Sequence, residues 1–233
     1  ATVQADRSFS NRYRRSFYML ILEAIAAVTG LVSVYLLTRQ SLWAWPTGLV
    51  SVSVAVVVFY DSFLYSDMLL HVYYIGMNIY GWIHWVRGGT EDSDLPVATM
   101  SPRRNVAWAV VTLILVMTWG WSMSNLDLIA AWFLTNVNDS IGWAQSWAAG
   151  NAPVPAYPYG DAFTTVASLI AMWFMARKLL ENWIYWFIID VVAITIYALK
   201  GLYLFAGQYT IFLILCVMGY REWVRSMRSG SSS

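Results

Sequence analysis

One apolar stretch of the sequence carries a row of polar and aromatic side chains that could hold a ligand. Neighbouring members are three or four positions apart, so on a helix they fall on a single stripe. Packing needs neither an amide nor an imidazole inside an apolar helix, which makes these residues candidates for a binding site or a permeation path. The stripe consists of His71, Tyr74, Asn78, Trp82 and Trp85.

A second apolar stretch carries a similar row. Asp190 stands well inside it, where an Asp at the centre of a bilayer costs about 2.5–3.5 kcal/mol on insertion scales. Such a residue is expected to face a cavity or a partner. The candidates from this stretch are Asn182, Trp183, Trp186, Asp190 and Tyr197, with Gln208 from the following stretch.

Together these side chains suit a flat nucleoside that is cationic or bears an amide. Indole faces stack on a flat ring and attract a cation, an Asn can pair with a carboxamide, and an Asp can accept from ribose hydroxyls. A metal site is not expected, because His71 has no second His or Cys at ligand spacing. We also expect no catalysis and no cofactor, since the sequence has no nucleophile with a matching base and no HExxH or GxSxG pattern.

The elements that must position these residues are membrane-spanning helices. The chain is 59% hydrophobic and 12% charged, and no basic patch interleaves with aromatic residues as nucleic-acid binding would require. The alternation typical of β-barrels is absent, which leaves helices. We predict an all-α integral membrane protein with seven spans, each needing about 20 residues, near 17–38, 42–61, 66–86, 105–124, 161–178, 182–200 and 204–224.

The chain contains the same three-helix unit twice, 138 positions apart and without a gap. Trp45 aligns with Trp183, and Gly81-x-x-x-Trp85-Val86-Arg87 aligns with Gly219-x-x-x-Trp223-Val224-Arg225. A three-helix unit reverses direction in the membrane, and the single span near 105–124 restores it. The sequence therefore predicts two parallel repeats joined by one linker helix, a 3+1+3 arrangement typical of transporters.

These features divide the chain into five segments and give it an orientation. The long aromatic stretch 125–158 predicts an interfacial helix followed by an extended linker. With the seven predicted spans, nine Lys and Arg fall on the side of the membrane that holds the C-terminus, and five fall on the opposite side. Because cytoplasmic loops are enriched in Lys and Arg, this favours an outside N-terminus and a cytoplasmic C-terminus. The segments are the tail 1–16, the first repeat 17–87, the linker helix with its loop 88–158, the second repeat 159–225 and the tail 226–233.

Some of these residues have a simpler explanation. Trp85 and Trp223 stand near span ends beside arginines, where indoles commonly anchor a helix at the membrane interface. Glu23 and Asp161 occupy equivalent positions near a span end. Either pairing with helix-end groups or contact with a substrate would explain these two carboxylates.

At the candidate residues the sequence resembles the PnuC family of bacterial nicotinamide riboside transporters. The resemblance rests on Asn78-Ile-Tyr-Gly-Trp82, on Arg177-Lys178-x-x-Glu181-Asn182-Trp183-x-x-Trp186 and on Ala198-Leu-Lys-Gly201-x-Tyr203. It implies passive uptake of nicotinamide riboside across the bacterial inner membrane, which phosphorylation inside the cell would pull inward. It also implies a fold similar to that of SWEET sugar transporters.

The resemblance implies one midplane site between the two repeats, in which the candidate residues take different roles. Trp183 and Trp186 would stack on or flank the pyridinium ring of the substrate. The other roles are recognition of polar substituents by Asn78 and Asn182, hydrogen bonds to the ribose or carboxamide from Asp190 and Gln208, and lining of the path by Tyr74, Trp82 and Tyr197.

The resemblance leads us to expect Gln at position 71 and Asn at position 190, where this sequence has His71 and Asp190. Either change would alter affinity, or make transport depend on pH through His71. An alternative to uniport is proton-coupled symport of a related nucleoside or a small sugar, using Glu23, Asp161 or Asp190. Homo-oligomer formation and the gating residues are left open.

Overall fold

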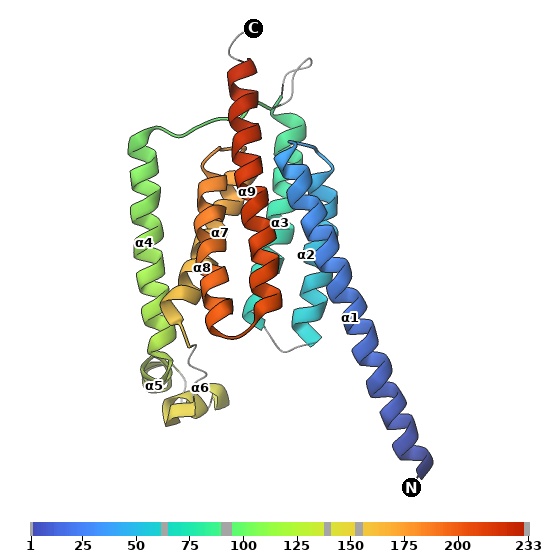
Figure 1. The fold of residues 1–233 in the computed structure, drawn as a ribbon. Coiled ribbons are helices and arrows are strands. Elements are labelled where there is room, and N and C mark those ends of the chain that lie inside the picture. The colour runs from blue at the N-terminus through green and yellow to red at the C-terminus, as the bar shows by residue number, and fades with distance from the viewer. Residues whose placement is uncertain (1, 62–64, 90–94, 138–140, 152–155, 231–233) are drawn as a thin grey trace. The chain divides into compact units, whose positions relative to one another are not determined.

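The computed structural model describes residues 2–61, 65–89, 95–137, 141–151 and 156–230, and nearly all of them lie in helices (Figure 1). Among these residues the β-structure is limited to one isolated parallel bridge between Ala98 and Leu179. The predicted all-α class is confirmed. The elements are α1 (Thr2–Thr38), α2 (Ala44–Asp61), α3 (Tyr65–Arg87), α4 (Pro102–Ser124), α5 (Leu126–Asn136), α6 (Gly142–Ser146), the π-helix η1 (Trp147–Asn151), α7 (Pro158–Ala176), α8 (Asn182–Leu199) and α9 (Tyr203–Gly230).

Five of the described helices are long and apolar enough to cross a membrane, and these are α1, α2, α4, α8 and α9. The helices α3 and α7, with 23 and 19 residues, are long enough as well but contain more polar and aromatic side chains. The seven-span arrangement therefore stays a prediction. The helix α1 begins at Thr2, so residues predicted as an N-terminal tail continue the first helix.

The chain forms two compact units, and α7, α8 and α9 each contribute to both. Unit 1 comprises Ala1–Thr99, Met172–Ile184 and Ile214–Ser233. Unit 2 comprises Met100–Ala171 and Tyr185–Leu213.

In unit 1, α1 packs on α2 and α2 on α3. Two serine hydroxyls join α1 to α2: Ser33 Oγ donates to Ala44 O at 2.8 Å, and Ser51 Oγ donates to Ala26 O at 2.7 Å. Between helices in a membrane, such hydrogen bonds from a side chain to a backbone carbonyl add to van der Waals packing.

The ends of α1 and α7 show that the repeat extends to the backbone. Each helix is followed by a non-glycine residue in the left-handed region, Gln40 with φ of 56° and Lys178 with φ of 55°. In each copy the next amide bonds back to the last turn, from Ser41 N to Leu36 O and from Leu179 N to Phe174 O, both at 3.0 Å. These are the six-to-one bonds of a Schellman cap, and they lie 138 positions apart.

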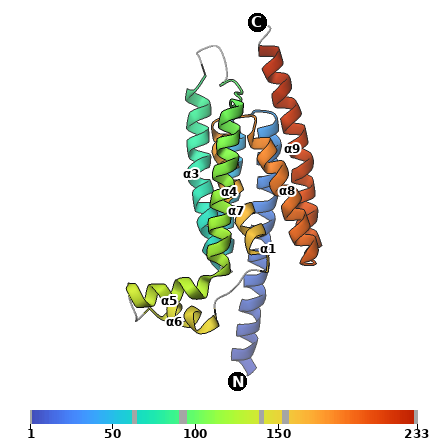
Figure 2. The ribbon, with the colours of Figure 1, turned by 90° about the vertical axis from the view of Figure 1, so that its left-hand side faces the viewer.

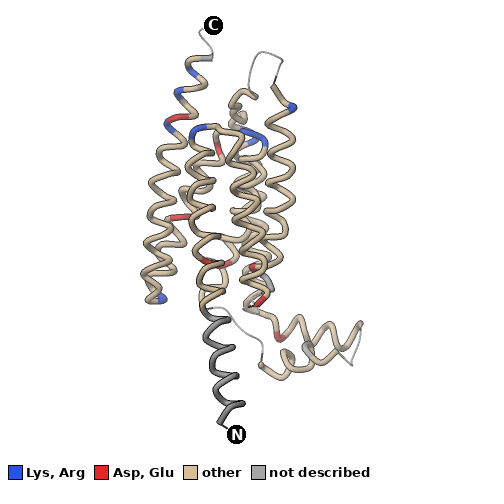
Figure 3. Tube along the Cα trace, turned by 90° about the vertical axis from the view of Figure 1, so that its right-hand side faces the viewer, with Lys and Arg blue, Asp and Glu red and all other residues tan. Residues whose placement is uncertain are grey.

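Basic residues gather near the ends of the helices, as the tube coloured by charge shows (Figure 3). In unit 1 the basic residues lie toward the C-terminal ends of α1, α3, α7 and α9 or directly after these helices. Glu222 forms ion pairs with two of them, Arg39 and Arg225. The basic residues at these ends are Arg39, Arg87, Arg177, Lys178, Arg221, Arg225 and Arg228.

In unit 2, α4 begins at Pro102, where the missing N–H costs nothing. The short helix α5 turns away from the axis of α4 and packs against α6 and η1 (Figure 2). The predicted interfacial helix is therefore present as a helix. The described residues Gly142–Asn151 that follow are also helical. The predicted extended linker rests on the proline-rich stretch, of which Pro153 and Pro155 lie outside the described residues, and it stays a prediction.

Candidate functional site

Asn78 lies buried inside the first three-helix repeat. Its Nδ2 donates to Tyr74 O at 2.8 Å, one turn earlier on α3. Its Oδ1 faces Gly48 on α2, where an added Cβ would stand 2.5 Å from Oδ1 and 2.8 Å from Ser33 Oγ. The amide is thus held by α3 and accommodated by a glycine on the neighbouring helix.

The other candidates on α3 lie in two environments. His71 Nδ1 donates to Asp67 O at 2.8 Å, and its ring stands 4.8 Å from Phe59 and 5.4 Å from Tyr74 between centroids. The structure therefore brings His71 and Tyr74 into contact. Trp82 is 40% exposed.

Asn182 and Trp183 are buried where α8 begins. Asn182 Nδ2 donates to Leu179 O, while its Oδ1 has no hydrogen-bond partner among the residues that the structure describes. The Trp183 ring fits against Gly219 and meets Trp223 edge-on at 5.4 Å. These are the contacts of a packing residue.

Two further candidates lie on α8 within unit 2. Trp186 is half-buried and packs against the cluster of Ala167, Ala171 and Ile189. Asp190, one turn further along, is 2% exposed. A buried carboxylate close to an indole can offset a positive charge on a flat ligand.

Tyr197 and Gln208 belong to the end of α8 and the start of α9. The Tyr197 ring stacks between Phe205 at 5.4 Å and Tyr209 at 5.3 Å. Gln208 is half-buried and precedes Tyr209 in the chain.

A small polar pocket in unit 2 connects Tyr197 to an ion pair. Asp161 Oδ1 lies 3.6 Å from Lys200 Nζ, so Asp161 pairs with a group at the end of a helix. The pocket has a volume of about 50 Å³, which suits one or two water molecules and is too small for a nucleoside. Its lining consists of Asp161, Thr164, Ala193, Ile196, Tyr197, Lys200 and Tyr209.

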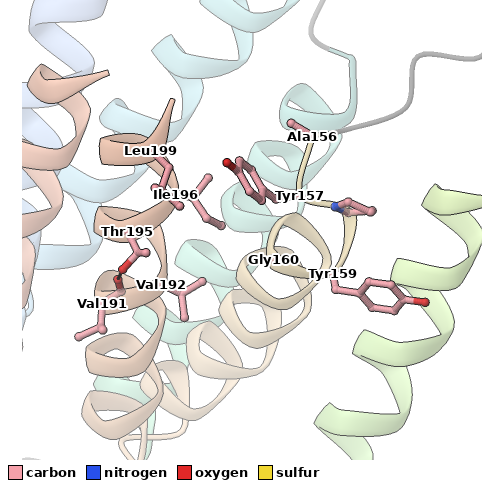
Figure 4. Close-up of a pocket in the computed structure, with 10 residues that line it drawn as sticks. Ala156, Tyr157, Tyr159, Gly160, Val191, Val192, Thr195, Ile196 and Leu199 are labelled. Carbon is pink, nitrogen blue, oxygen red and sulfur yellow. Dashed lines mark hydrogen bonds between the residues drawn. The ribbon is translucent and has the colours of Figure 1, made fainter. Parts of the chain in front are cut away.

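A larger, open cavity of about 500 Å³ lies between the start of α7 and the outer face of α8 (Figure 4). Its walls are mainly apolar and include Tyr157, Val191, Thr195 and Leu199. None of the predicted site residues lines it.

Sequence reasoning missed a chain of four tryptophans in unit 1. Trp45 meets Trp85 at 5.1 Å, Trp85 meets Trp223 at 5.9 Å, and Trp223 meets Trp183 at 5.4 Å between ring centroids. The offset of 138 exchanges Trp45 with Trp183 and Trp85 with Trp223, so the row of four indoles is the same when it is followed from either end. The signal was present in the sequence, because these indoles are the aligned tryptophans of the two repeats.

The four indoles are buried, with Trp85 at 3% and Trp223 at 0% exposure. This burial does not fit anchoring at a membrane surface, which was the simpler explanation of Trp85 and Trp223. The equivalent residues of the two copies, Trp85 and Trp223, therefore meet at one place in unit 1.

Comparison with known proteins places these features in context. The sequence profile of a family described as "Nicotinamide mononucleotide transporter" matches residues 20–225. The nicotinamide riboside transporter PnuC of Escherichia coli (strain K12) is 29% identical over 214 residues, which cover 91% of this chain and 88% of the relative. The riboflavin/roseoflavin transporter RibM of Streptomyces davaonensis is 26% identical over 208 residues, 88% of this chain and 86% of the relative.

One solved structure has a similar fold. The crystal structure of the vitamin B3 transporter PnuC aligns with a TM-score of 0.62 and 20% sequence identity, over 89% of this chain and 82% of the other. At this identity the similarity concerns the fold.

Proposed function

Because this chain belongs to the nicotinamide mononucleotide transporter family, whose profile covers residues 20–225, we propose that it takes up nicotinamide riboside by facilitated diffusion. The observation that carries the substrate is the 29% identity, over 91% of this chain, to a relative named as a nicotinamide riboside transporter. Family membership confirms that the chain is a transporter and not an enzyme.

The proposed architecture has seven spans, arranged as two parallel three-helix repeats around the linker helix α4. Support comes from unit 1, where equivalent helix ends of both repeats meet in the tryptophan chain. Antiparallel repeats would put these ends on opposite sides of the membrane. The basic residues at the same helix ends favour a cytoplasmic location for this end, in a bacterial inner membrane.

The proposed substrate site draws on all ten candidate residues, led by an indole, a carboxylate and an amide. Trp183 packs against Gly219 and Trp223, so we assign stacking on the pyridinium ring chiefly to Trp186. Asp190 then offsets the positive charge, and Asn78 pairs with a polar substituent. The remaining candidates are His71, Tyr74, Trp82, Asn182, Tyr197 and Gln208.

Binding to the purified protein tests both substrate and site. Calorimetry should show that nicotinamide riboside binds and that its phosphorylated form, nicotinamide mononucleotide, does not. Trp186→Ala should weaken binding by about 1–3 kcal/mol, the range for stacking of a base on an aromatic ring. Trp119→Ala, which removes an indole that is 51% exposed on α4, is the matched control and should bind normally. Failure of the riboside to bind would overturn the substrate assignment, and unchanged affinity in Trp186→Ala would overturn the site.

A second candidate substrate is riboflavin, because a relative of similar coverage is named as a riboflavin/roseoflavin transporter. Both ligands are flat ring systems that carry a hydroxylated chain or sugar, and both could stack on Trp186. Calorimetry with riboflavin in the same preparation separates the two substrates.

Proton-coupled symport stays the alternative to uniport. Asp190 is a buried carboxylate on a spanning helix and would be the proton carrier in that mechanism. In liposomes without a kinase, uniport predicts that a protonophore leaves uptake unchanged. Symport predicts that the protonophore abolishes accumulation and that Asp190→Asn has the same effect.

A further inference from the structure

The two repeats meet in unit 1 along two seams that the repeat relates to each other. The α1–α9 seam contains Leu37, Arg39, Glu222 and Trp223. The α3–α7 seam contains Tyr80, His84, Trp85 and Trp173, together with Arg177 and Lys178 that follow α7. The contacts that hold the two seams together differ, and this difference bears on how the proposed transporter would open.

The α3–α7 seam is held by two half-buried rings, a buried lysine and main-chain bonds. Tyr80 and Trp173 are stacked with centroids 5.4 Å apart and ring planes 7° from parallel. Lys178, itself 2% exposed, places its ammonium 4.6 Å from the centroid of Trp85 and donates to Leu95 O. A desolvated cation over an indole is a strong contact.

A strap of chain also crosses the α3–α7 seam. Ala98 N donates to Lys178 O at 3.1 Å, and Leu180 N donates to Ala98 O at 2.9 Å. These bonds join the segment after α3 to the turn between α7 and α8, and they fasten one repeat to the other through the backbone.

The α1–α9 seam has weaker fastenings. Trp223 Nε1 donates to Leu37 O at 3.0 Å, which is a single hydrogen bond. Arg39 lies 3.7 Å from Glu222, with side chains that are 55% and 38% exposed, and exposed ion pairs of this kind contribute little. At the equivalent place in the other seam, Trp85 Nε1 has no hydrogen-bond partner within the described part of the chain.

We propose that this end of the transporter opens by parting the α1–α9 seam, with the bond from Trp223 to Leu37 O as the latch. The α3–α7 seam stays closed and serves as the hinge. The inference rests on the proposed transport function, in which substrate moving along the axis between the repeats must pass Trp85 and Trp223. Among the described contacts, the α1–α9 seam has fewer buried ones and costs less free energy to part, so the motion is asymmetric although the fold is repeated.

Spin labels at matched positions test the motion without substrate. In a Cys216→Ser background, one protein carries Arg39→Cys and Glu222→Cys across the α1–α9 seam. The control carries His84→Cys and Arg177→Cys, which are the equivalent positions across the α3–α7 seam. Pulsed electron paramagnetic resonance in lipid nanodiscs should give two distance populations for the first pair and one for the control. A single population in the first pair, or two in the control alone, would overturn the inference.

Cross-linking the same cysteine pairs connects the motion to transport. A short thiol cross-linker between positions 39 and 222 should lower nicotinamide riboside uptake into liposomes at least tenfold, and reductant should restore it. The cross-link between positions 84 and 177 should leave uptake within about twofold of the uncross-linked protein. Equal loss from both cross-links would contradict an asymmetric opening. Calorimetry on the cross-linked proteins separates this failure from that of the proposed function, because a wrong substrate would show no binding before or after cross-linking.

Discussion

In the first repeat, α1 and α2 are joined by the hydroxyls of Ser33 and Ser51, whereas the equivalent positions of the second repeat are Ala171 and Ile189. The second pair belongs to an apolar cluster between α7 and α8. The same helix pair is thus held by side-chain hydrogen bonds in one copy and by close packing in the other. Both are established ways to join helices in a membrane.

The two repeats are alike at their helix ends and differ in the middle of their helices. The left-handed turns after α1 and α7 and the indoles against Gly81 and Gly219 are alike in both copies. The middle of the helices differs, since Asn78 corresponds to Cys216 and Trp186 to Gly48. A substrate with two unlike ends needs unlike halves, and the frame that carries them can stay symmetric.

The largest effect is expected where the two copies are most alike. A Cβ on Gly81 would overlap ring carbons of Trp45, and a Cβ on Gly219 would stand 2.5 Å from Trp183 Cζ2. Because both indoles are buried and held by a second indole, they cannot swing away. Gly81→Ala and Gly219→Ala should each lower the free energy of unfolding in detergent by about 3 kcal/mol, at the upper end for overpacking.

The same helices supply matched controls for the glycine substitutions. Gly76 on α3 and Gly207 on α9 have open space where a Cβ would stand. Gly76→Ala and Gly207→Ala should be neutral or stabilise by up to about 1 kcal/mol through helix propensity. If all four variants unfold alike, the indole–glycine contacts do not define the shared frame.

A smaller effect distinguishes the two left-handed turns. Lys178→Gly loses the bond to Leu95 O and the contact with Trp85, and it should lower the free energy of unfolding by about 2 kcal/mol. Gln40→Gly relieves a left-handed φ of 56° and should raise it by about 1 kcal/mol. Denaturant titration of both variants measures the difference. Changes of the same sign would show that Lys178 has no special role at its turn.

The sequence was sufficient for the parts of the fold that repeat. Helical class, the positions of the long helices and the aligned Trp and Gly residues follow from composition and periodicity, which act locally. The contacts of the same residues do not follow from the sequence. Trp85 beside an arginine looks like an interface anchor, and only the meeting of α3 with α9 buries it against Trp223. Lys178 likewise gave no signal of burial, because its partner Leu95 O lies 83 residues away in the chain.

The candidate site was predictable in residue type but not in geometry. Spacing identified Asn78 as a polar residue on a stripe of α3. The direction of its amide depends on Gly48, which belongs to another helix and leaves the space that Oδ1 occupies. Helix periodicity cannot supply this contact, because it depends on how two helices approach each other.

A still smaller difference should separate the two central indoles. Trp223→Phe removes the donor to Leu37 O and leaves a buried carbonyl without that bond, which should cost about 1–2 kcal/mol beyond the change in ring size. Trp85→Phe makes the same change in ring size but removes an N–H that has no partner among the described residues. Thermal unfolding of both variants gives the difference directly. Equal losses would mean that the bond from Trp223 to Leu37 O contributes nothing to stability.

The smallest effect is expected at the serines that join α1 to α2, Ser33 and Ser51. Ser33→Ala gives α1 the residue that the second repeat has at this position, and it removes the bond to Ala44 O. Side-chain hydrogen bonds between membrane helices average about 0.6 kcal/mol, so the loss should be of that size. The reverse change, Ala171→Ser, puts a hydroxyl into an apolar cluster and should destabilise the second repeat by at least as much. If Ala171→Ser proves neutral, the serine would fit either copy, and the two repeats would differ at this position without any energetic reason.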